Sequence, residues 1–369
     1  MHDVIVVGAG PSGSSSALFL ARRGLDVLII EKKRLPRYKV CAGGTSRYIF
    51  ELLGVPPSYF DAFNIEKLKV CYEDRVREYS IPGNSIFTLH RDRFDYKLTK
   101  LACQNGAKLI DGEEVIEIEE ENNSLTVKTN LGHKFKTRYL IGADGVGSKI
   151  ARFIGSKFRY RIPLAIQKDI PYKDPEPTIS LFMGLVPMGY GWIFPKDDTL
   201  SIGIGAYSFS PRRMPQVLSK LLKDFDRKDI PILAHPIAFY RGKKRLATKN
   251  VILVGDSAHI ADPFSGEGIR NGIKSAKIAE ETITECIKKN KPLSFYTERL
   301  YNAMARELFL AWMMSGIFYK FQGRIFNLMD RFDMGTILSN LLNEKISYLQ
   351  ILKKLLKRIF YRTYLMVFS

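Results

Sequence analysis

The fold of this chain is decided by one stretch, "DVIVVGAGPSGSSSALFLARRGLDVLIIE" (residues 3–31). It predicts a buried strand, a glycine-rich turn, a helix and a second strand that ends at Glu31. Gly8, Gly10 and Gly13 form the pattern GxGxxG directly after the first strand and at the start of the helix. Glu31 lies about twenty residues beyond these glycines, where such units carry an acidic residue. The pattern and its flanking elements are therefore typical of a dinucleotide-binding unit.

This glycine turn suits a pyrophosphate group. Unpaired backbone amides at a helix N-terminus bind phosphate oxygens, and the Glu31 carboxylate can accept hydrogen bonds from a ribose. A tight turn without a ligand is the alternative, and the strand, the helix and the acidic residue together count against it. The turn does not distinguish between NAD and FAD as the bound dinucleotide.

Two later segments favour FAD. The first, "YLIGADGVGSKIAR" (residues 139–152), predicts a strand that ends at Asp144 and is followed by a helix start. The second, "NVILVGDSAHIADPFSGEGIRNGIKSA" (residues 250–276), predicts a strand that ends at Asp256, a glycine-rich loop and a long helix. Asp256 can accept hydrogen bonds from a sugar-alcohol chain, and the loop glycines let backbone amides approach an electron-rich ring edge. Because a nicotinamide cofactor has no ribityl chain, the second aspartate loop favours a flavin.

These three motifs together resemble those of the FAD-dependent oxidoreductases shaped like aromatic hydroxylases. Within that group the chain is similar to the geranylgeranyl reductase family of the archaeal-lipid type, which saturates isoprenoid double bonds. The resemblance covers residues 3 to about 290. Three further segments carry it: "RYKVCAGG" (37–44) matches the family's CxGG loop, "PMGYGWIFP" (187–195) matches PxxYxWxFP at every fixed position, and "HRDRFDYKL" (90–98) matches an R..FD..L segment seen before a helix of the FAD domain.

The resemblance implies an α/β fold with three parts. A Rossmann-like FAD-binding domain carries an inserted, mainly antiparallel β-sheet for the substrate, and a helical C-terminal region follows. The expected ranges are 1–60, 90–155 and 245–290 for the discontinuous FAD domain, 61–89 and 156–244 for the substrate-binding sheet domain, and 291–369 for the helical region with its basic amphipathic tail.

The resemblance also names residues that line the cofactor. Besides Gly8, Gly10, Gly13, Glu31, Asp144 and Asp256, it implies FAD contacts for Ser12, Ala42, Gly43, Arg91, Val115, Gly268 and Ile269. Cys41 stands before the glycines of the CxGG loop, so we expect it in the active site, either as a proton donor or as a residue that shapes the pocket. The ordinary alternative is a small buried hydrophobe, which is how we interpret Cys71, Cys103 and Cys286. His259 is another possible acid, with a capping or solvated histidine as the alternative.

Three aromatic residues form a candidate binding wall. Tyr190, Trp192 and Phe194 would share one face of a strand, because side chains alternate along extended backbone. Half of an ordinary sheet core is the alternative. The segments "TISLFMG", "GYGWIFP" and "LSIGIGA" predict successive strands between the two aspartate motifs, where this fold inserts its substrate sheet. Aromatic faces suit a polyprenyl chain, which is held mainly by buried apolar area at roughly 25 cal/mol per Å². We therefore expect all three to bind substrate, and Tyr190 and Trp192 to act with Cys41 in catalysis.

The chain carries a formal charge of +19, and its C-terminal tail, "KISYLQILKKLLKRIFYRTYLMVFS" (residues 345–369), is basic and contains no acidic residue. Tyr348, Leu352 and Ile359 lie at helical spacing between lysines and arginines. Such a basic amphipathic pattern suits a helix on an anionic membrane surface. A packed C-terminal helix with a solvated basic face is the alternative. Nucleic acid fits poorly, because the charge is not tied to a known binding module.

Several classes of protein are disfavoured by the sequence. The four cysteines are scattered without paired spacing, so neither a metal site nor a disulfide framework is expected. A strand pattern begins by Val4, which leaves no room for a signal peptide. The longest apolar run, "LFLAWMMSGIFY" (308–319), is too short to span a bilayer. We expect a cytoplasmic protein that is peripheral at the membrane.

The resulting hypothesis is an FAD-dependent reductase of carbon–carbon double bonds in geranylgeranyl (polyprenyl) chains of a lipid or a diphosphate. One alternative is a flavin-dependent monooxygenase on the same fold. A second is a non-catalytic prenyl-binding protein of the Rab escort kind, which the intact glycine loop disfavours. The electron donor, NADPH or ferredoxin, stays open, as do the head group, the number of bonds reduced and the oligomeric state.

Overall fold

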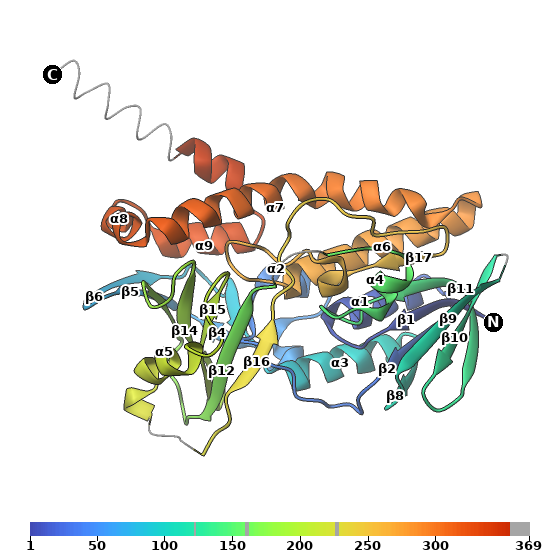
Figure 1. The fold of residues 1–369 in the computed structure, drawn as a ribbon, viewed down its shortest axis with the longest axis horizontal. Coiled ribbons are helices and arrows are strands. Elements are labelled where there is room, and N and C mark those ends of the chain that lie inside the picture. The colour runs from blue at the N-terminus through green and yellow to red at the C-terminus, as the bar shows by residue number, and fades with distance from the viewer. Residues whose placement is uncertain (122, 159–161, 226–228, 355–369) are drawn as a thin grey trace.

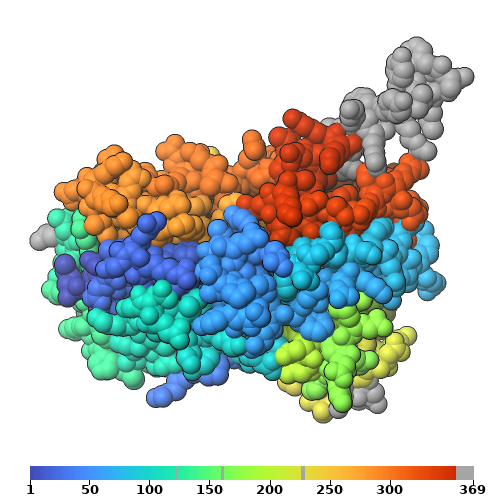
Figure 2. All heavy atoms as spheres, turned by 180° about the vertical axis from the view of Figure 1, so that it is seen from behind, coloured from blue at the N-terminus to red at the C-terminus, as the bar shows by residue number. Residues whose placement is uncertain are grey.

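The computed structural model describes residues 1–121, 123–158, 162–225 and 229–354. Two seven-stranded sheets lie next to each other beneath a layer of helices, and a small three-stranded sheet lies between the larger ones (Figure 1). From behind, the C-terminal residues, coloured orange to red, form the top layer across the molecule (Figure 2). The predicted fold class, an α/β protein with a second sheet and a helical C-terminal region, is confirmed.

The first sheet has the strand order β8-β2-β1-β11-β10-β9, with β17 paired to β11. Strands β8, β2, β1, β11 and β17 run parallel, and β9, β10 and β11 form an antiparallel meander. Helix α1 packs between α3 and α6, so β1 and β2 are nearly continuous buried apolar runs, as parallel strands under helices are. The bounds are β1 (His2–Val7), β2 (Val27–Glu31), β8 (Lys108–Asp111), β9 (Val115–Glu121), β10 (Ser124–Thr129), β11 (Lys134–Gly142), β17 (Val251–Leu253), α1 (Pro11–Ala21), α3 (Arg91–Gln104), α4 (Lys149–Phe153) and α6 (Ile269–Lys289).

The second sheet has the order β16-β12-β15-β14-β13-β5-β6 and is antiparallel except for the parallel pair β13–β5. Its strands come from two separate parts of the chain. One face packs on α5 and the other on α8 and α9. The bounds are β5 (Lys67–Tyr72), β6 (Arg75–Ser80), β12 (Leu164–Pro171), β13 (Thr178–Met183), β14 (Gly189–Lys196), β15 (Thr199–Ala206), β16 (Leu233–Pro236) and α5 (Met214–Leu221), and the small sheet consists of β3 (Gly44–Ser46), β7 (Ile86–Thr88) and β4 (Phe63–Ile65).

The helical C-terminal region runs across the top of both sheets in Figure 1. Its helices are α7 (Tyr296–Lys320), α8 (Gln322–Leu328) and α9 (Met334–Leu342), and a short α2 (Arg47–Leu53) lies below α6 and α9. Across the described ranges, no helix combines the length and the apolar character that a membrane span requires.

The R..FD..L segment is placed differently from the expectation. It lies inside α3, which begins at Arg91, rather than before a helix. Phe94, Leu98 and Leu101 recur at helical spacing and are all buried, so burial of this face requires the segment itself to be helical.

The start of the basic tail is also packed rather than free. Tyr348, which the sequence pattern assigns to a membrane-facing side, is 3% exposed, and its hydroxyl donates to the Asp262 carboxylate at 2.9 Å. Lys353 and Lys354 are exposed, and the rest of the predicted amphipathic helix, residues 355–369, lies outside the described residues.

One close contact sets the position of α1 over β1. A Cβ at Gly13 would overlap the carbonyl oxygen of Gly8, which itself has φ +105°. The backbone that leads into Gly8 cannot retreat, because β1 is paired on both edges. This contact therefore requires glycine at position 13.

We expect Gly13→Ala to lower the free energy of unfolding by about 1–3 kcal/mol, as overpacking does, and to release the dinucleotide. Gly316→Ala is the matched control, since Gly316 is helical with no neighbour within 4 Å, and alanine there should stabilise α7 by up to about 1 kcal/mol. Denaturant unfolding and bound-cofactor absorbance measure both. A Gly13→Ala protein as stable as the wild type would contradict the proposed contact.

Candidate active site

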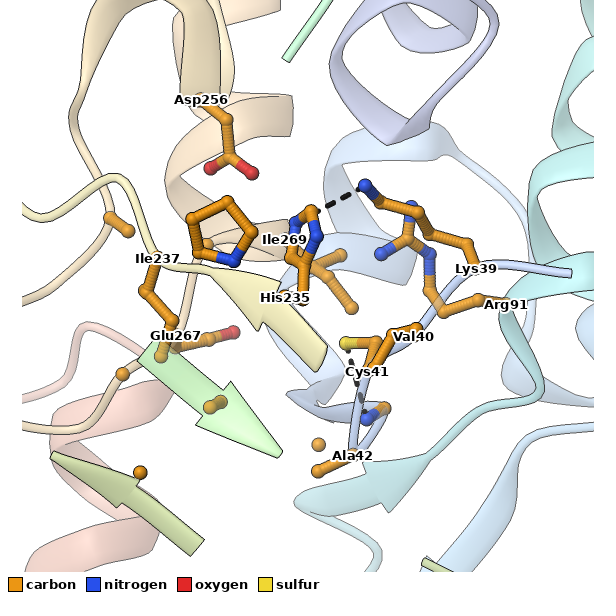
Figure 3. A pocket seen from close by; sticks show the side chains of 18 of the residues that line it. Lys39, Val40, Cys41, Ala42, Arg91, His235, Ile237, Asp256, Glu267 and Ile269 are labelled. Atoms are coloured by element: carbon orange, nitrogen blue, oxygen red, sulfur yellow. Dashed lines mark hydrogen bonds between the residues drawn. The ribbon is translucent and has the colours of Figure 1, made fainter. Parts of the chain in front are cut away.

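A cavity of about 620 Å³ lies between the carboxyl ends of the parallel strands and the second sheet. The loops after β1, β2, β11 and β17 and the start of α6 line one side, and strands β12 to β16 line the other. Ligands bind at this edge of a parallel sheet because the loops from all its strands meet there. Figure 3 shows one part of the cavity, where the loop that carries Cys41 faces β16 and the start of α6.

The glycine turn presents bare amides to this cavity. Helix α1 begins after Gly10, which offers no side-chain cap, and Pro11 follows at the first helical position. The Glu31 carboxylate is buried and accepts hydrogen bonds from the amides of Ala9 at 2.8 Å and Lys33 at 3.1 Å. The backbone thus fixes an acceptor at one end of the turn, while the α1 amides are available to an anion.

One buried carboxylate on α3, that of Asp95, holds two arginine side chains at the cavity. Asp95, which is fully buried, accepts two hydrogen bonds from Arg91, each at 2.9 Å, and one from Arg37 at 3.0 Å. A paired carboxylate of this kind fixes the planar guanidinium groups in orientation. The aspartate of the R..FD..L segment is therefore the partner of its arginine one helical turn away.

A lysine and a histidine meet across the cavity. The Lys39 Nζ lies 3.1 Å from Nε2 of His235 on β16, although the two residues are 196 positions apart (Figure 3). Burial lowers the pKa of Lys39 to about 8, and burial lowers the pKa of His235 to about 4. His235 is therefore a neutral acceptor for the ammonium group. Burial also raises the pKa of Asp256, while the positive charges of Lys39 and Arg91 act in the opposite direction.

The CxGG loop is held by a contact within the loop and by two side chains of the second sheet. The Gly43 amide donates to the Cys41 sulfur at 3.3 Å, and the Cys41 carbonyl lies 3.4 Å from both Gln167 Nε2 and Lys196 Nζ. A Cβ at Gly43 would overlap the carbonyl oxygen of Leu89. The second sheet and the CxGG loop are thus tied together where the thiol lines the cavity.

The three aromatic residues of β14 all line the cavity. The Tyr190 ring lies 6.0 Å from the Trp192 ring and stacks on Tyr319 at 6.2 Å, while the Tyr190 hydroxyl donates to the carbonyl of Ser265 at 3.0 Å. A Cβ at Gly203 on β15 would overlap the indole of Trp192. The glycine in the neighbouring strand therefore makes room for the tryptophan.

Beyond this wall the cavity becomes an apolar channel between the second sheet and the C-terminal helices. The sheet supplies Leu68, Val70, Ile179, Leu181 and Met183, and the helical region supplies Phe318, Met329, Met334, Leu338 and Leu342. A channel with such walls suits a long hydrocarbon chain.

A second acid lines the cavity at the start of α6. The Glu267 carboxylate accepts from Thr45 Oγ1 at 3.3 Å and lies 3.1 Å from Nε of Arg270. Arg270 lies 3.7 Å from Asp262 and donates to the carbonyl of Leu341. Burial raises the pKa of Glu267 to about 7, opposed by the charge of Arg270. This carboxyl can therefore hold a proton near neutral pH.

The structure places the predicted site residues as follows. Those on the cavity are Gly8, Gly10, Ser12, Glu31, Cys41, Ala42, Gly43, Arg91, Val115, Asp144, Tyr190, Trp192, Phe194, Asp256, Gly268 and Ile269. Gly13 lies behind the turn. The Asp144 carboxylate caps α4 by accepting from Ser148 Oγ at 2.5 Å and the Lys149 amide at 2.6 Å.

Lys39, His235 and Glu267 were not among the predicted residues. Lys39 and Glu267 lie inside the quoted CxGG and aspartate-loop segments, where their charge next to glycines was a usable signal. His235 has no such local pattern. His259 is 3% exposed and stacks on Phe158 at 3.7 Å, so the solvated alternative is wrong, and burial lowers its pKa to about 4.

One group among the described residues has metal-like spacing, namely His90, Asp197 and Asp198. Arg93 donates to both of these carboxylates, at 2.7 and 2.8 Å. The group therefore forms an ion-pair cluster around a guanidinium.

Comparisons with known proteins agree with this geometry. A family described as FAD binding domain matches residues 1–170. An uncharacterised protein of Methanosarcina barkeri is 32% identical over 330 residues, covering 86% of this chain and 84% of that protein. The menaquinone reductase of Mycobacterium tuberculosis is 30% identical and covers 76% of each chain. The digeranylgeranylglycerophospholipid reductase of Methanocella arvoryzae is 28% identical, with 83% of this chain and 84% of that protein covered.

A solved structure shares the whole architecture. The geranylgeranyl bacteriochlorophyll reductase-like protein of Thermoplasma acidophilum superposes with a TM-score of 0.80 at 23% identity, covering 96% of this chain and 98% of that chain. This chain belongs to the geranylgeranyl reductase family. It is an FAD-dependent oxidoreductase, and the predicted cofactor is confirmed.

The residues of this family member fit FAD. The bare amides of α1 and the side-chain-free Gly8 and Gly10 form a cradle for phosphate oxygens, and the fixed Glu31 carboxylate lies at the end of β2. The glycine-rich start of α6 and Asp256 line the same cavity from the other side of the sheet edge. The donors and acceptors are therefore arranged for a long, polar cofactor that ends beside an apolar channel.

We expect Glu31→Ala to weaken retention of FAD, because each hydrogen bond to a charged acceptor contributes about 1.5–3 kcal/mol. The exposed Glu120→Ala on β9 is the matched control. Flavin absorbance per protein after gel filtration measures both. Equal flavin content in the two variants would show that Glu31 does not hold the cofactor.

The second expectation at this site concerns pH. The folded-state pKa of Glu267 is raised above the unfolded value, so its stabilising contribution is complete below pH 4.5 and is lost as the pH rises through 7. Glu267→Gln cannot ionise. The free energy of unfolding of this variant relative to the wild type should therefore increase between pH 4.5 and 8, by an amount on the order of 3 kcal/mol.

Denaturant titrations of the holoprotein at several pH values measure this difference. Glu78→Gln is the control, since the hydrogen bond from Lys69 lowers the pKa of Glu78; its contribution to stability is lost only as the pH falls below the unfolded value, so its difference from the wild type should stay nearly constant over this range. A flat difference for Glu267→Gln would mean that Glu267 is ionised throughout this range.

Proposed function

We propose that this chain saturates carbon–carbon double bonds in geranylgeranyl or other polyprenyl chains of lipids or their precursors. One observation carries the proposal: a single cavity joins the dinucleotide cradle to a channel walled by aliphatic and aromatic side chains. Relatives named as reductases of a digeranylgeranyl lipid and of menaquinone support it. A small polar substrate would leave the channel unused.

The proposal gives each part of the cavity a task. Arg91, Asp256 and the residues of the glycine turn bind the cofactor. FAD, when bound and reduced, supplies the hydride that adds to one alkene carbon. Because an isolated alkene has no carbonyl group to accept charge, the protein must act mainly by placing the bond and excluding water. Tyr190, Trp192 and Phe194 do this by fixing the register of the chain through apolar contact.

The second alkene carbon requires a proton, and two groups on the cavity can hold one. The first is the thiol of Cys41, which lines the cavity and receives the Gly43 amide. The second is the carboxyl group of Glu267, whose raised pKa keeps it partly protonated at neutral pH. Shaping of the pocket remains the alternative task for Cys41.

The reaction is tested with the purified flavoprotein reduced by dithionite and mixed with a geranylgeranyl lipid. We expect mass increments of two daltons for each saturated bond. Oxygen consumption with hydroxylated product would instead establish the monooxygenase alternative. Unchanged lipid with every geranylgeranyl head group tried would refute the proposal.

Trp192→Ala tests the placement of the chain. We expect a folded, fully flavin-loaded protein whose rate of reduction falls about a hundredfold, since small misplacements at a reacting centre have effects of that size. Ile193→Ala is the matched control, because Ile193 lies on the other face of β14 against a separate core. It should lower stability without a selective loss of rate.

Melting temperature, flavin content and lipid reduction are measured on one preparation of each variant. If Trp192 is only a core residue, its removal should cost roughly 3–5 kcal/mol of stability, and activity should fall only with the unfolded fraction. A fully active Trp192→Ala protein would remove the aromatic wall from the active site.

We also propose that the protein is peripheral at an anionic membrane surface. The described part of the basic tail ends in the exposed pair Lys353 and Lys354, and Lys357, Arg358 and Arg362 follow in the sequence. Each such cation near an anionic surface contributes about 1 kcal/mol.

A further inference from the structure

Helix α7 carries a row of exposed apolar side chains on the side away from the sheets. The row consists of Phe309, Trp312, Met313 and Ile317 of α7 and of Phe321, which directly follows the helix; they are exposed by 51%, 46%, 36%, 54% and 40%. We call it the α7 stripe. Its spacing keeps the helical side chains on one face of α7. The opposite face of α7 is buried through other residues, so the stripe is not needed for packing within the chain.

The segment of sequence that carries the α7 stripe contains charged residues of one sign only. Between Glu307 and Asp330 the sequence contains no acidic residue and two basic ones, Lys320 and Arg324. Their cationic groups lie 5.5 and 5.8 Å from the centre of the Phe321 ring. The stripe therefore ends in an aromatic ring flanked by cations, a combination typical of helices that lie in a membrane interface.

The basic tail starts beside the same face. Ile346 and Ile351 pack against the same small apolar cluster, around Ala311 of α7, as Leu310 and Met314 do. Lys353 and Lys354, the last two described residues, therefore follow directly on a segment that packs near α7 (Figure 1). The apolar stripe and the cations of the tail can meet one surface together.

Helix α7 also borders the apolar channel. Phe318 and Tyr319 line the cavity, whereas Ile317 beside them is exposed on the stripe. At this point only the width of helix α7 separates the outer surface from the inside of the channel. A hydrocarbon chain that leaves a lipid layer at the stripe would have only the α7–α9 layer to pass.

We propose that the α7 stripe is the surface by which this protein docks on an anionic lipid membrane, with α7 lying in the plane of the interface. A second copy of the chain explains the surroundings less well, because two copies of a chain with net charge +19 repel each other. The choice of lipid as partner rests on the proposed polyprenyl substrate, whereas binding to vesicles can be measured without any reduction.

The test compares full-length flavoproteins by co-sedimentation with vesicles of phosphatidylcholine and phosphatidylglycerol. Trp312→Ser/Ile317→Ser removes the centre of the stripe. Ile116→Ser/Leu131→Ser is the matched control, since these residues are equally exposed, by 55% and 61%, but lie at the edge of the first sheet. We expect the stripe variant to bind about tenfold more weakly or worse, and the control to bind like the wild type.

Measurements at high salt separate the contribution of the stripe to vesicle binding from that of the tail. At 0.5 M salt, where charges are screened beyond about 5 Å, a protein truncated after Lys354 should keep the apolar share of binding, and the stripe variant should lose it. The chain has two tryptophans, and Trp192 is 6% exposed, so a blue shift of fluorescence on vesicles that disappears in Trp312→Phe reports insertion of the stripe.

Equal vesicle binding by the wild type and the stripe variant would overturn the proposal. So would a dimer of the wild type that dissociates in the stripe variant, because it would make a second copy the partner. Reduction of a detergent-solubilised geranylgeranyl lipid should be the same in the wild type and both variants. Loss of that activity in all three proteins would count against the proposed function, and not against membrane docking.

Discussion

The contact between Gly13 and Gly8 is the constraint on which the remaining architecture depends. It lets α1 cross β1 at a distance that no side chain would allow, and so brings the bare amides of the helix to the edge of the sheet. The same edge receives the end of β2, where the backbone holds the Glu31 carboxylate. A cradle for phosphates and an acceptor for a sugar arise from one turn because both are fixed by backbone atoms.

Around this edge, buried charges are placed by paired side chains, some of them distant in sequence. Asp95 holds Arg91 and Arg37, and His235 receives Lys39 across the cavity. A cationic group that is removed from water needs such a partner, because an unpaired buried charge is strongly unfavourable. The pairs therefore give the cavity a positive wall beside the dinucleotide cradle, while the channel farther along is apolar.

The C-terminal helices complete the cavity from above. Arg270 at the start of α6 contacts Glu267 and Asp262 and donates to the end of α9. Tyr348 donates to the same Asp262. This buried polar cluster ties the helical region to the loop that follows β17. The layer of α7, α8 and α9 is thereby held over the channel, with one side lining it and the other facing solvent.

The sequence by itself determined the features that depend on local order along the chain. The glycine turn, the strands around Tyr190, Trp192 and Phe194, and the family membership follow from spacing and side-chain alternation within short segments, because backbone geometry sets both periods. Local pattern was less reliable where the neighbours lie far away. The R..FD..L segment proved to be part of α3, and Tyr348 proved to be buried, since each is held by partners distant in sequence. Only the tertiary structure brought His235 to Lys39, placed the stripe of α7 outside and its neighbours inside, and made Glu267 a proton-holding group, because burial and charge pairing arise only when distant segments pack together.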